Sequence, residues 1–188
     1  MIVFVDTNVW YPVVLADLVL RSVEIGLFDL AWTDESLAEV ERVLVERKGL
    51  SARSAAVFGE QVRATAPAGR IDFAVYDTLV AAMTGPDPDD HVHAAAARGG
   101  RVDVLLTSNV ADFPEGDVGP NCRVLNPGEL FRDLVVTYPL EVRRVVTEMA
   151  AHRRRPPMAP ADILDRLDAL GLHDMVVALR QRDLDHPG

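Results

Sequence analysis

The chain opens with Met1-Ile2-Val3-Phe4-Val5-Asp6-Thr7-Asn8, a short apolar run that ends on a carboxylate and two small hydrogen-bonding side chains. Ile, Val and Phe are typical of a strand that is covered on both faces, whereas Asp, Thr and Asn favour turns, caps and binding sites. We therefore expect Asp6 at the carboxyl end of a first strand. Ligands bind at this edge of open α/β sheets, so Asp6 is the first candidate for a functional residue.

After this strand the chain alternates between helical and extended patterns as far as residue 125. This alternation predicts a parallel sheet flanked by helices, in a three-layer α/β/α sandwich. The expected helices cover residues 10–26, 33–49, 51–64 and 87–98, and the expected further strands cover 27–32, 71–75, 102–107 and 122–125. The helix near residue 90 has a strong start signal, since Asp87 can be its N-cap and Pro88 its first residue.

Beyond Pro127 the sequence shows helical periods and no strand pattern. The helices are expected at residues 129–135, 140–151, 161–170 and 173–182. We therefore divide the chain into an α/β domain, residues 1–130, and a helical C-terminal extension, residues 131–188. The apolar spacings Ile163-Leu167-Leu170 and Met175-Val176-Leu179 predict packing surfaces, and their partner can be the same domain, a second subunit or another protein.

Composition limits the class of protein. The 188 residues suffice for one α/β domain with a small appendage, and 49% hydrophobic with 26% charged residues is typical of a soluble globule. No apolar stretch has the length of a membrane span, and the N-terminus lacks the features of a signal peptide, so we expect a cytoplasmic protein without membrane contact. Cys122 is the single cysteine, which excludes an intrachain disulfide, and we expect it to be buried in the last strand.

The net charge of −10 argues against a general electrostatic attraction to nucleic acid. It does not exclude an enzyme that acts on nucleic acid, because metal ions held by clustered carboxylates can receive phosphate oxygens.

Acidic residues occur where several predicted elements begin or end. Asp6 follows the first strand, Asp87, Asp89 and Asp90 precede a helix, and Asp112 follows the strand at 102–107. A further acid, Glu39 or Glu41, lies on the helix that begins at Thr33. The carboxyl ends of parallel strands share one edge of a sheet, so Asp6 and Asp112 should lie near each other there.

Several carboxylates at one place repel one another unless they are protonated or bind a cation. Clusters of oxygen ligands suit hard divalent ions, chiefly Mg²⁺ or Mn²⁺. On a phosphodiester such ions neutralise phosphate oxygens, generate a hydroxide nucleophile and stabilise the leaving oxygen. The chain has no nucleophile elbow, no glycine-rich phosphate loop and no dinucleotide-binding glycine pattern, which would indicate other chemistry.

Four motifs together resemble PIN-domain proteins of the VapC toxin type. They are Asp6-Thr7-Asn8, the run from Ser36 to Leu44 that contains Glu39, Asp87-Pro88-Asp89-Asp90-His91-Val92 before Ala94-Ala95-Ala96, and Leu106-Thr107-Ser108-Asn109-Val110-Ala111-Asp112-Phe113-Pro114. Each motif alone is weak, but all four occur in the order and spacing of the family, over roughly residues 1 to 130.

The resemblance implies a Mg²⁺- or Mn²⁺-dependent endoribonuclease, the toxin of a toxin–antitoxin pair, with an RNA substrate, a cognate antitoxin that blocks it and a homodimeric state. By position, Asp6, Glu39 and Asp90 match the family's metal-binding acids. The fourth position departs from the family pattern, because Asn109 stands where many relatives have an acid. Asp112 is then the nearest carboxylate and the fourth expected ligand, and Asn109 or Thr107 would orient a ligand or a phosphate. Whether the site holds one or two metal ions stays open.

Two other functions compete with this one. In a phosphatase Asp6 would be a covalent nucleophile, although such sites usually have a second aspartate where this chain has Asn8. In a binding or scaffolding module the same fold would lack catalysis, and Asn109 is the residue that favours this interpretation.

The sequence also leaves several assignments to be tested. Helical periodicity places Glu41 within the apolar stripe if Leu37, Leu44 and Val45 form it, and Glu39 at its border if Val40 and Val43 centre it. The resemblance selects Glu39, which we prefer. We interpret His91 and His93 as solvated or capping residues, since two-residue spacing points them to different sides of a helix.

Thr7 and Asn8 are expected to form a turn or to support a ligand. The run Arg153-Arg154-Arg155 is expected to be a solvated loop rather than a contact to RNA.

Overall fold

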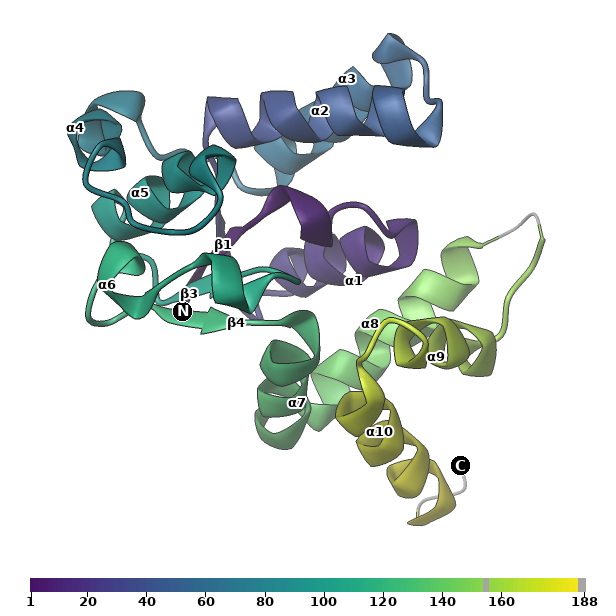
Figure 1. The fold of residues 1–188 in the computed structure, drawn as a ribbon. Helices are drawn as coiled ribbons and strands as arrows, with labels where there is room; N and C mark the ends of the chain where they lie inside the picture. The colour runs from purple at the N-terminus through teal and green to yellow at the C-terminus, as the bar shows by residue number, and fades with distance from the viewer. Residues whose placement is uncertain (154–155, 186–188) are drawn as a thin grey trace. The chain divides into compact units, whose positions relative to one another are not determined.

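The computed structural model describes residues 1–153 and 156–185 and contains one parallel sheet (Figure 1). Its strands are β1 (Ile2–Val5), β2 (Asp29–Ala31), β3 (Val104–Leu106) and β4 (Arg123–Leu125), in the order β2-β1-β3-β4. All three neighbouring pairs are parallel. The predicted fold class, a three-layer α/β/α sandwich with a helical C-terminal region, is confirmed by this sheet and the helices around it.

The predicted helices occur in the predicted order with small changes of boundary. In the first part of the chain the helices are α1 (Val13–Glu24), α2 (Asp34–Lys48), α3 (Ala52–Thr65), α4 (Asp77–Val80), α5 (His91–Gly99) and α6 (Glu115–Val118). The short helices α4 and α6 were not predicted. Four short 3-10 helices are η1 (Thr7–Val9), η2 (Phe73–Val75), η3 (Pro88–Asp90) and η4 (Val110–Asp112). The later helices are α7 (Pro127–Thr137), α8 (Pro139–His152), α9 (Pro160–Asp168) and α10 (His173–Asp185).

The chain forms two compact units. The first, here called the sheet unit, comprises Met1–Tyr11 and Phe28–Asn126. The second, the helical unit, comprises Pro12–Leu27 and the chain from Pro127 onward, so that α1 belongs with the C-terminal helices. Within the described residues, no helix is both long enough and apolar enough to cross a lipid bilayer.

The core of the sheet unit is built on the face that α5 covers. Phe4 and Leu105 are paired in register on β1 and β3 and are fully buried. The run Ala94–Ala97 packs against them in one hydrophobic cluster. Alanine side chains let the α5 backbone approach the sheet closely, and this approach brings the start of α5 to the end of β1.

Side-chain caps mark the start of several helices, among them α2 and η3. Thr33 accepts a hydrogen bond from Ser36 N–H, and α2 ends at Gly49, whose φ of 65° is in the left-handed region. The predicted N-cap Asp87 is confirmed, because its side chain accepts from Asp89 N–H at the start of η3, which leads directly into α5.

The strand expected at residues 71–75 is wrong. One isolated bridge joins Trp32 and Arg70, and the chain then turns into η2 because Asp72 accepts a hydrogen bond from Ala74 N–H. Phe73 and Val75 are about half exposed, whereas Tyr76 is fully buried. Residues 71–75 have the composition of a strand, but the cap at Asp72 and the burial of the Tyr76 ring favour a turn there.

The position expected for Cys122 is also wrong. It directly precedes β4 and is only half-buried. Together with Pro114 and Val124 it lines an open groove along the outer side of β4.

The helical unit has its own core. Ile163 and Leu167 of α9 and Met175, Val176 and Leu179 of α10 are buried, which confirms the predicted packing surfaces except at Leu170, which is exposed. Since α9 contacts α8 and α10, these surfaces pack within the unit. Arg153 lies 3.7 Å from Asp17 of α1, whereas Arg154 and Arg155 lie outside the described residues.

Candidate metal centre

Asp6 lies at the carboxyl end of β1, as the sequence predicts. Its backbone N–H donates to Leu106 O at 2.9 Å, which continues the parallel pairing by one residue. The side chain is 3% exposed, so its charge depends on neighbouring donors for stabilisation.

Four donors surround this carboxylate. Oδ1 accepts from Thr7 N at 2.6 Å and from His93 Nδ1 at 2.9 Å. Oδ2 accepts from Asn8 Nδ2 at 2.5 Å and from Thr107 Oγ1 at 2.7 Å. Thr7 and Asn8 therefore form the turn that was expected of them and also hold the acid in place.

The turn after β3 reinforces the same arrangement. Asn8 Oδ1 accepts from Ser108 N at 2.8 Å, and Thr107 Oγ1 accepts from Asn109 N at 3.0 Å. The segments after β1 and β3 are thus tied together by side chains. This network fixes the turn after β3 that carries Asn109.

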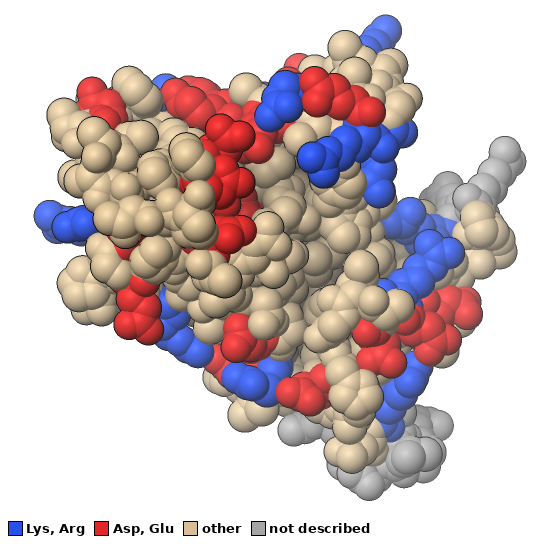
Figure 2. All heavy atoms as spheres, in the orientation of Figure 1, with Lys and Arg blue, Asp and Glu red and all other residues tan. Residues whose placement is uncertain are grey.

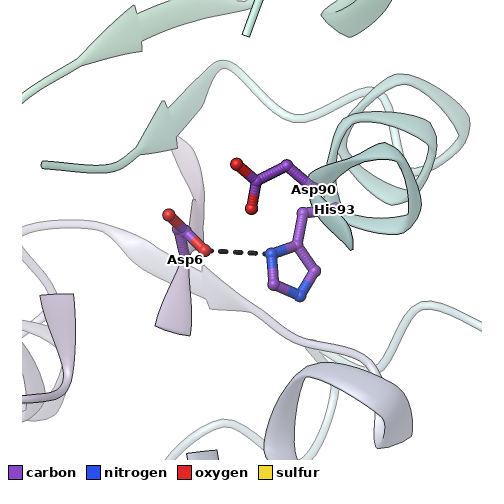
Figure 3. A group of neighbouring side chains, drawn as sticks. All are labelled: Asp6, Asp90 and His93. Carbon is purple, nitrogen blue, oxygen red and sulfur yellow. Dashed lines mark hydrogen bonds and ion pairs between the residues drawn. The ribbon is translucent and has the colours of Figure 1, made fainter. Parts of the chain in front are cut away.

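Asp90 lies at the junction of η3 and α5, and its carboxylate faces that of Asp6 (Figure 3). Burial and the nearby Asp6 charge raise the pKa of Asp90 to about 6. A carboxyl group with this pKa is in an environment that disfavours further negative charge and favours a cation.

Asp117 of α6 holds the loop before Asp90. This buried acid accepts from Thr84 N at 2.6 Å, Thr84 Oγ1 at 3.0 Å and Gly85 N at 2.9 Å. Gly85 O in turn bonds with His91 Nε2 at 2.8 Å. The approach to Asp90 is therefore anchored at both ends.

The prediction that His93 is solvated or capping is wrong. Its ring is 2% exposed and lies against Asp6 beside Asp90 (Figure 3). Nε2 lies 3.2 Å from Glu39 Oε2, in an ion pair that is not aligned as a hydrogen bond. Burial lowers the pKa of His93, but the interactions with Asp6 and Glu39 outweigh burial and raise it to about 9.

Glu39, and not Glu41, faces this centre. Glu39 Oε2 accepts from Thr7 Oγ1 at 2.9 Å, and the interaction with His93 lowers the pKa of Glu39. Glu41 lies 3.5 Å from Arg63 and packs over Gly59 of α3, so it joins the two helices. The resemblance therefore selected the residue nearer the site, and so did the stripe centred on Val40 and Val43, which are buried, whereas Val45 is exposed.

Asp112 and Asn109 stand further from the centre. Asp112 ends η4, and its charge adds to the rise in the pKa of Asp90. Asn109 is exposed, and its side chain makes no capping bond to η4. Of the four predicted acids, Asp6 and Asp90 come together directly, Glu39 joins through His93 and Thr7, and Asp112 acts at longer range.

The described residues contain one group of side chains that could hold a metal ion, Asp6, Asp90 and His93, whose possible ligand atoms lie within 4.8 Å of one another. Figure 2 shows acidic side chains gathered on the surface beside α5 and the start of α2. Two facing carboxylates, one with a raised pKa, fit a hard divalent cation.

Sequence reasoning missed His93 and Asp117. Nothing in the two-residue spacing of His91 and His93 reveals that α5 turns His93 inward, although the alanines after it mark the buried face. Asp117 carries no motif, and its role depends on a loop more than 30 residues away.

Comparison with known protein families identifies the N-terminal part of the chain. Residues 2–111 match the family model described as "PIN domain". The chain belongs to the PIN-domain family. The C-terminal helices match a second model, described as "VapC50 C-terminal domain", over residues 127–181. The two matches together support a PIN protein of the VapC type.

One curated relative of this PIN protein is named "Putative ribonuclease VapC50" and comes from Mycobacterium tuberculosis. The two are 33% identical over 93 residues, which are 49% of this chain and 54% of the relative. The match thus spans about half of each protein. No solved structure matches the chain.

Proposed function

We propose that the protein is a Mg²⁺- or Mn²⁺-dependent endoribonuclease and the toxin of a type II toxin–antitoxin pair. The observation that carries this proposal is the pair of facing carboxylates, Asp6 and Asp90, at the carboxyl edge of a parallel sheet. The family assignment and the name of the relative agree with it.

Asp6 and Asp90 would hold the ion, with Glu39 and Asp112 nearby. When bound, the divalent ion would neutralise phosphate oxygens and lower the pKa of a water molecule that attacks phosphorus. Thr7, Asn8 and Thr107 keep Asp6 oriented through their hydrogen bonds. Asn109 is exposed next to this network, and its side-chain amide would donate to a phosphate oxygen.

Exposed basic residues form a surface that could contact RNA, although the net charge of the chain is negative. Arg42, Arg47 and Lys48 are exposed on α2, about 4.5 to 13.5 Å beyond Glu39 along the helix axis. Lys48 Nζ lies 4.7 Å from the centre of the Tyr11 ring, so a cation and an aromatic face occur together. Figure 2 shows basic side chains at this far end of α2. Such a surface suits the phosphates and bases of a single strand.

The two competing functions are less well supported. A covalent phosphatase of this kind usually has a second aspartate two residues after the first, where this chain has Asn8, whose side chain donates to Asp6 Oδ2. A scaffold without catalysis does not need two facing carboxylates, whose mutual repulsion costs folding free energy.

The antitoxin, the homodimer and the cytoplasmic location belong to the same proposal. Co-expression with the product of a small neighbouring reading frame should give a complex that no longer cleaves RNA. Light scattering of the isolated chain should give the mass of a dimer.

The decisive experiment measures cleavage of a labelled RNA by the purified chain with Mn²⁺, with excess chelator, and after Asp6→Asn or Asp90→Asn. Cleavage should require the metal and fall at least about 100-fold in both variants, with circular dichroism confirming that they fold. Full activity in excess chelator, or full activity of both variants, would contradict the proposed mechanism. An aspartyl-phosphate trapped on Asp6 would favour the phosphatase instead.

A further inference from the structure

His93 lies between Asp6 and Glu39, deep inside the proposed centre. One ring nitrogen is 2.9 Å from Asp6 and the other is 3.2 Å from Glu39. Thr7 makes a second bridge, with its N–H on Asp6 and its hydroxyl on Glu39. The two carboxylates are thus held at a fixed separation by a buried ring and a backbone turn.

The ring occupies the place that a cation between these carboxylates would need. A carboxylate attracts positive charge on any side where it has no other partner. On the side of Asp6 that faces Glu39, the imidazole of His93 already occupies this place. The ring also packs against Phe4, at 5.8 Å between ring centres, which restricts its movement. A metal ion bound to both Asp6 and Glu39 would overlap this ring.

Asp6 itself has little capacity left. A carboxylate offers about four lone pairs, and four donors use them. An ion that binds Asp6 must therefore replace a side-chain donor, and the open approach is from Asp90. The possible ligand atoms of Asp6, Asp90 and His93 lie within 4.8 Å of one another, and Glu39 is not part of this group.

We propose that His93 is a positioning residue that fixes Asp6 and Glu39 and fills the space between them, so that the centre binds a single divalent ion on the Asp90 side. This inference rests on the proposed metal-dependent function and deepens it. Glu39 then acts on the site through His93 and Thr7 rather than as a direct ligand of the same ion.

A positioning role and a metal-ligating role of His93 give different magnetic resonance spectra. A ligating imidazole nitrogen couples magnetically to bound Mn²⁺, whereas a ring that faces carboxylate oxygens does not. Two neighbouring Mn²⁺ ions couple to each other, whereas a single ion keeps the resolved hyperfine pattern of an isolated centre.

The experiment is a Mn²⁺ titration of the full chain without RNA, followed by calorimetry and by continuous-wave and pulsed electron paramagnetic resonance. Wild type should bind one ion per chain, without nitrogen coupling. His93→Ala should bind two, because Asp6 and Glu39 then face each other across an empty space. His173→Ala, which changes an exposed histidine of α10, should bind one.

Two ions on wild type, nitrogen coupling, or one ion on His93→Ala would overturn the inference while leaving the proposed nuclease intact. No Mn²⁺ binding by wild type would overturn both. If His93→Ala does not fold by circular dichroism, the stoichiometry and nitrogen coupling of wild type still decide the matter.

Discussion

Thr107 Oγ1 lies 2.7 Å from Asp6 Oδ2 and joins the carboxyl ends of β3 and β1. The contact follows from strand register, since Val5 and Leu106 are paired and Asp6 and Thr107 come directly after them. Thr107 Oγ1 also accepts from Asn8 Nδ2 at 3.1 Å and from Asn109 N at 3.0 Å. One buried hydroxyl therefore connects the acid of the first strand to the turn that carries Asn109.

Thr107→Val should weaken the centre while nearly preserving its shape. Valine keeps the volume but removes the donor to Asp6, so Mn²⁺ affinity should fall about 10- to 100-fold, as for other residues that orient a metal ligand. The free energy of unfolding should fall by about 1–3 kcal/mol, because buried partners lose a hydrogen bond. Calorimetry and thermal melting measure both quantities.

The control is Thr137→Val, at an exposed threonine of α7 whose hydroxyl donates to Asp133 O within its own helix. It should leave Mn²⁺ affinity unchanged. An equal loss of affinity in both variants would contradict the role given to Thr107.

Gly85→Ala should disturb the approach to Asp90. A Cβ on Gly85 would lie 2.6 Å from Asp112 O, a backbone atom that cannot move without shifting η4. Such overpacking costs about 1–3 kcal/mol of stability. Because the same loop leads to Asp90, RNA cleavage should also fall. Gly116→Ala is the matched control, since a Cβ there meets nothing within 4 Å. Equal melting temperatures of the two variants would refute the argument.

The sequence predicted the parts of the fold that depend on local patterns. The strand before Asp6, the helix start at Thr33, the cap Asp87 and the C-terminal helices follow from hydrophobic period and capping chemistry. Residues 71–75 failed because a single Asp72 cap decides between strand and turn there. Such a choice depends on which side chain the core accepts, and that is a property of the whole fold.

Of the residues in the site, only the acidic ones could be predicted from the sequence. Asp6 and Asp90 carry a signal because each sits at an element boundary. His93 has no such signal, because its burial depends on how α5 rotates against Phe4, and its partners are 87 and 54 residues away in sequence. Contacts of this kind are set by the tertiary structure and not by spacing.

Asp117→Asn should destabilise the protein at neutral pH by about 1.5–3 kcal/mol, since hydrogen bonds to a charged acceptor are lost. Burial raises the pKa of Asp117, but the Thr84 and Gly85 donors outweigh burial and lower it below the ordinary 3.8. A lowered pKa contributes stability above pH 3.8 that is lost as the pH falls through the folded value. The difference in melting temperature from wild type should therefore shrink below about pH 3.8.

Asp29→Asn, at an exposed position of β2, is the control and should melt like wild type throughout. A difference between Asp117→Asn and wild type that does not change with pH would show that the charge of Asp117 is not what holds the loop.

The double change Arg47→Gln, Lys48→Gln should weaken RNA binding without changing the chemical step. The slope of log K against log salt should become shallower by about 0.7 for each phosphate of a single strand that the protein no longer neutralises. KM should rise while kcat stays close to wild type. Arg70→Gln is the control, because Arg70 is paired with Asp34 and Asp72 and should not contact RNA. An unchanged salt slope in the double variant would exclude this path.

Glu39→Gln and Glu41→Gln form a matched pair that separates site from scaffold. Glu39 faces His93 and Thr7, so its loss should lower cleavage by about 10- to 100-fold with a smaller effect on stability. Glu41 lies 3.5 Å from the partly exposed Arg63, and such pairs contribute about 0–1 kcal/mol, so its loss should leave cleavage near wild type. Single-turnover cleavage and thermal melting of both variants measure the contrast. If Glu41→Gln were the inactive variant, the assignment of Glu39 rather than Glu41 to the centre would have to be abandoned.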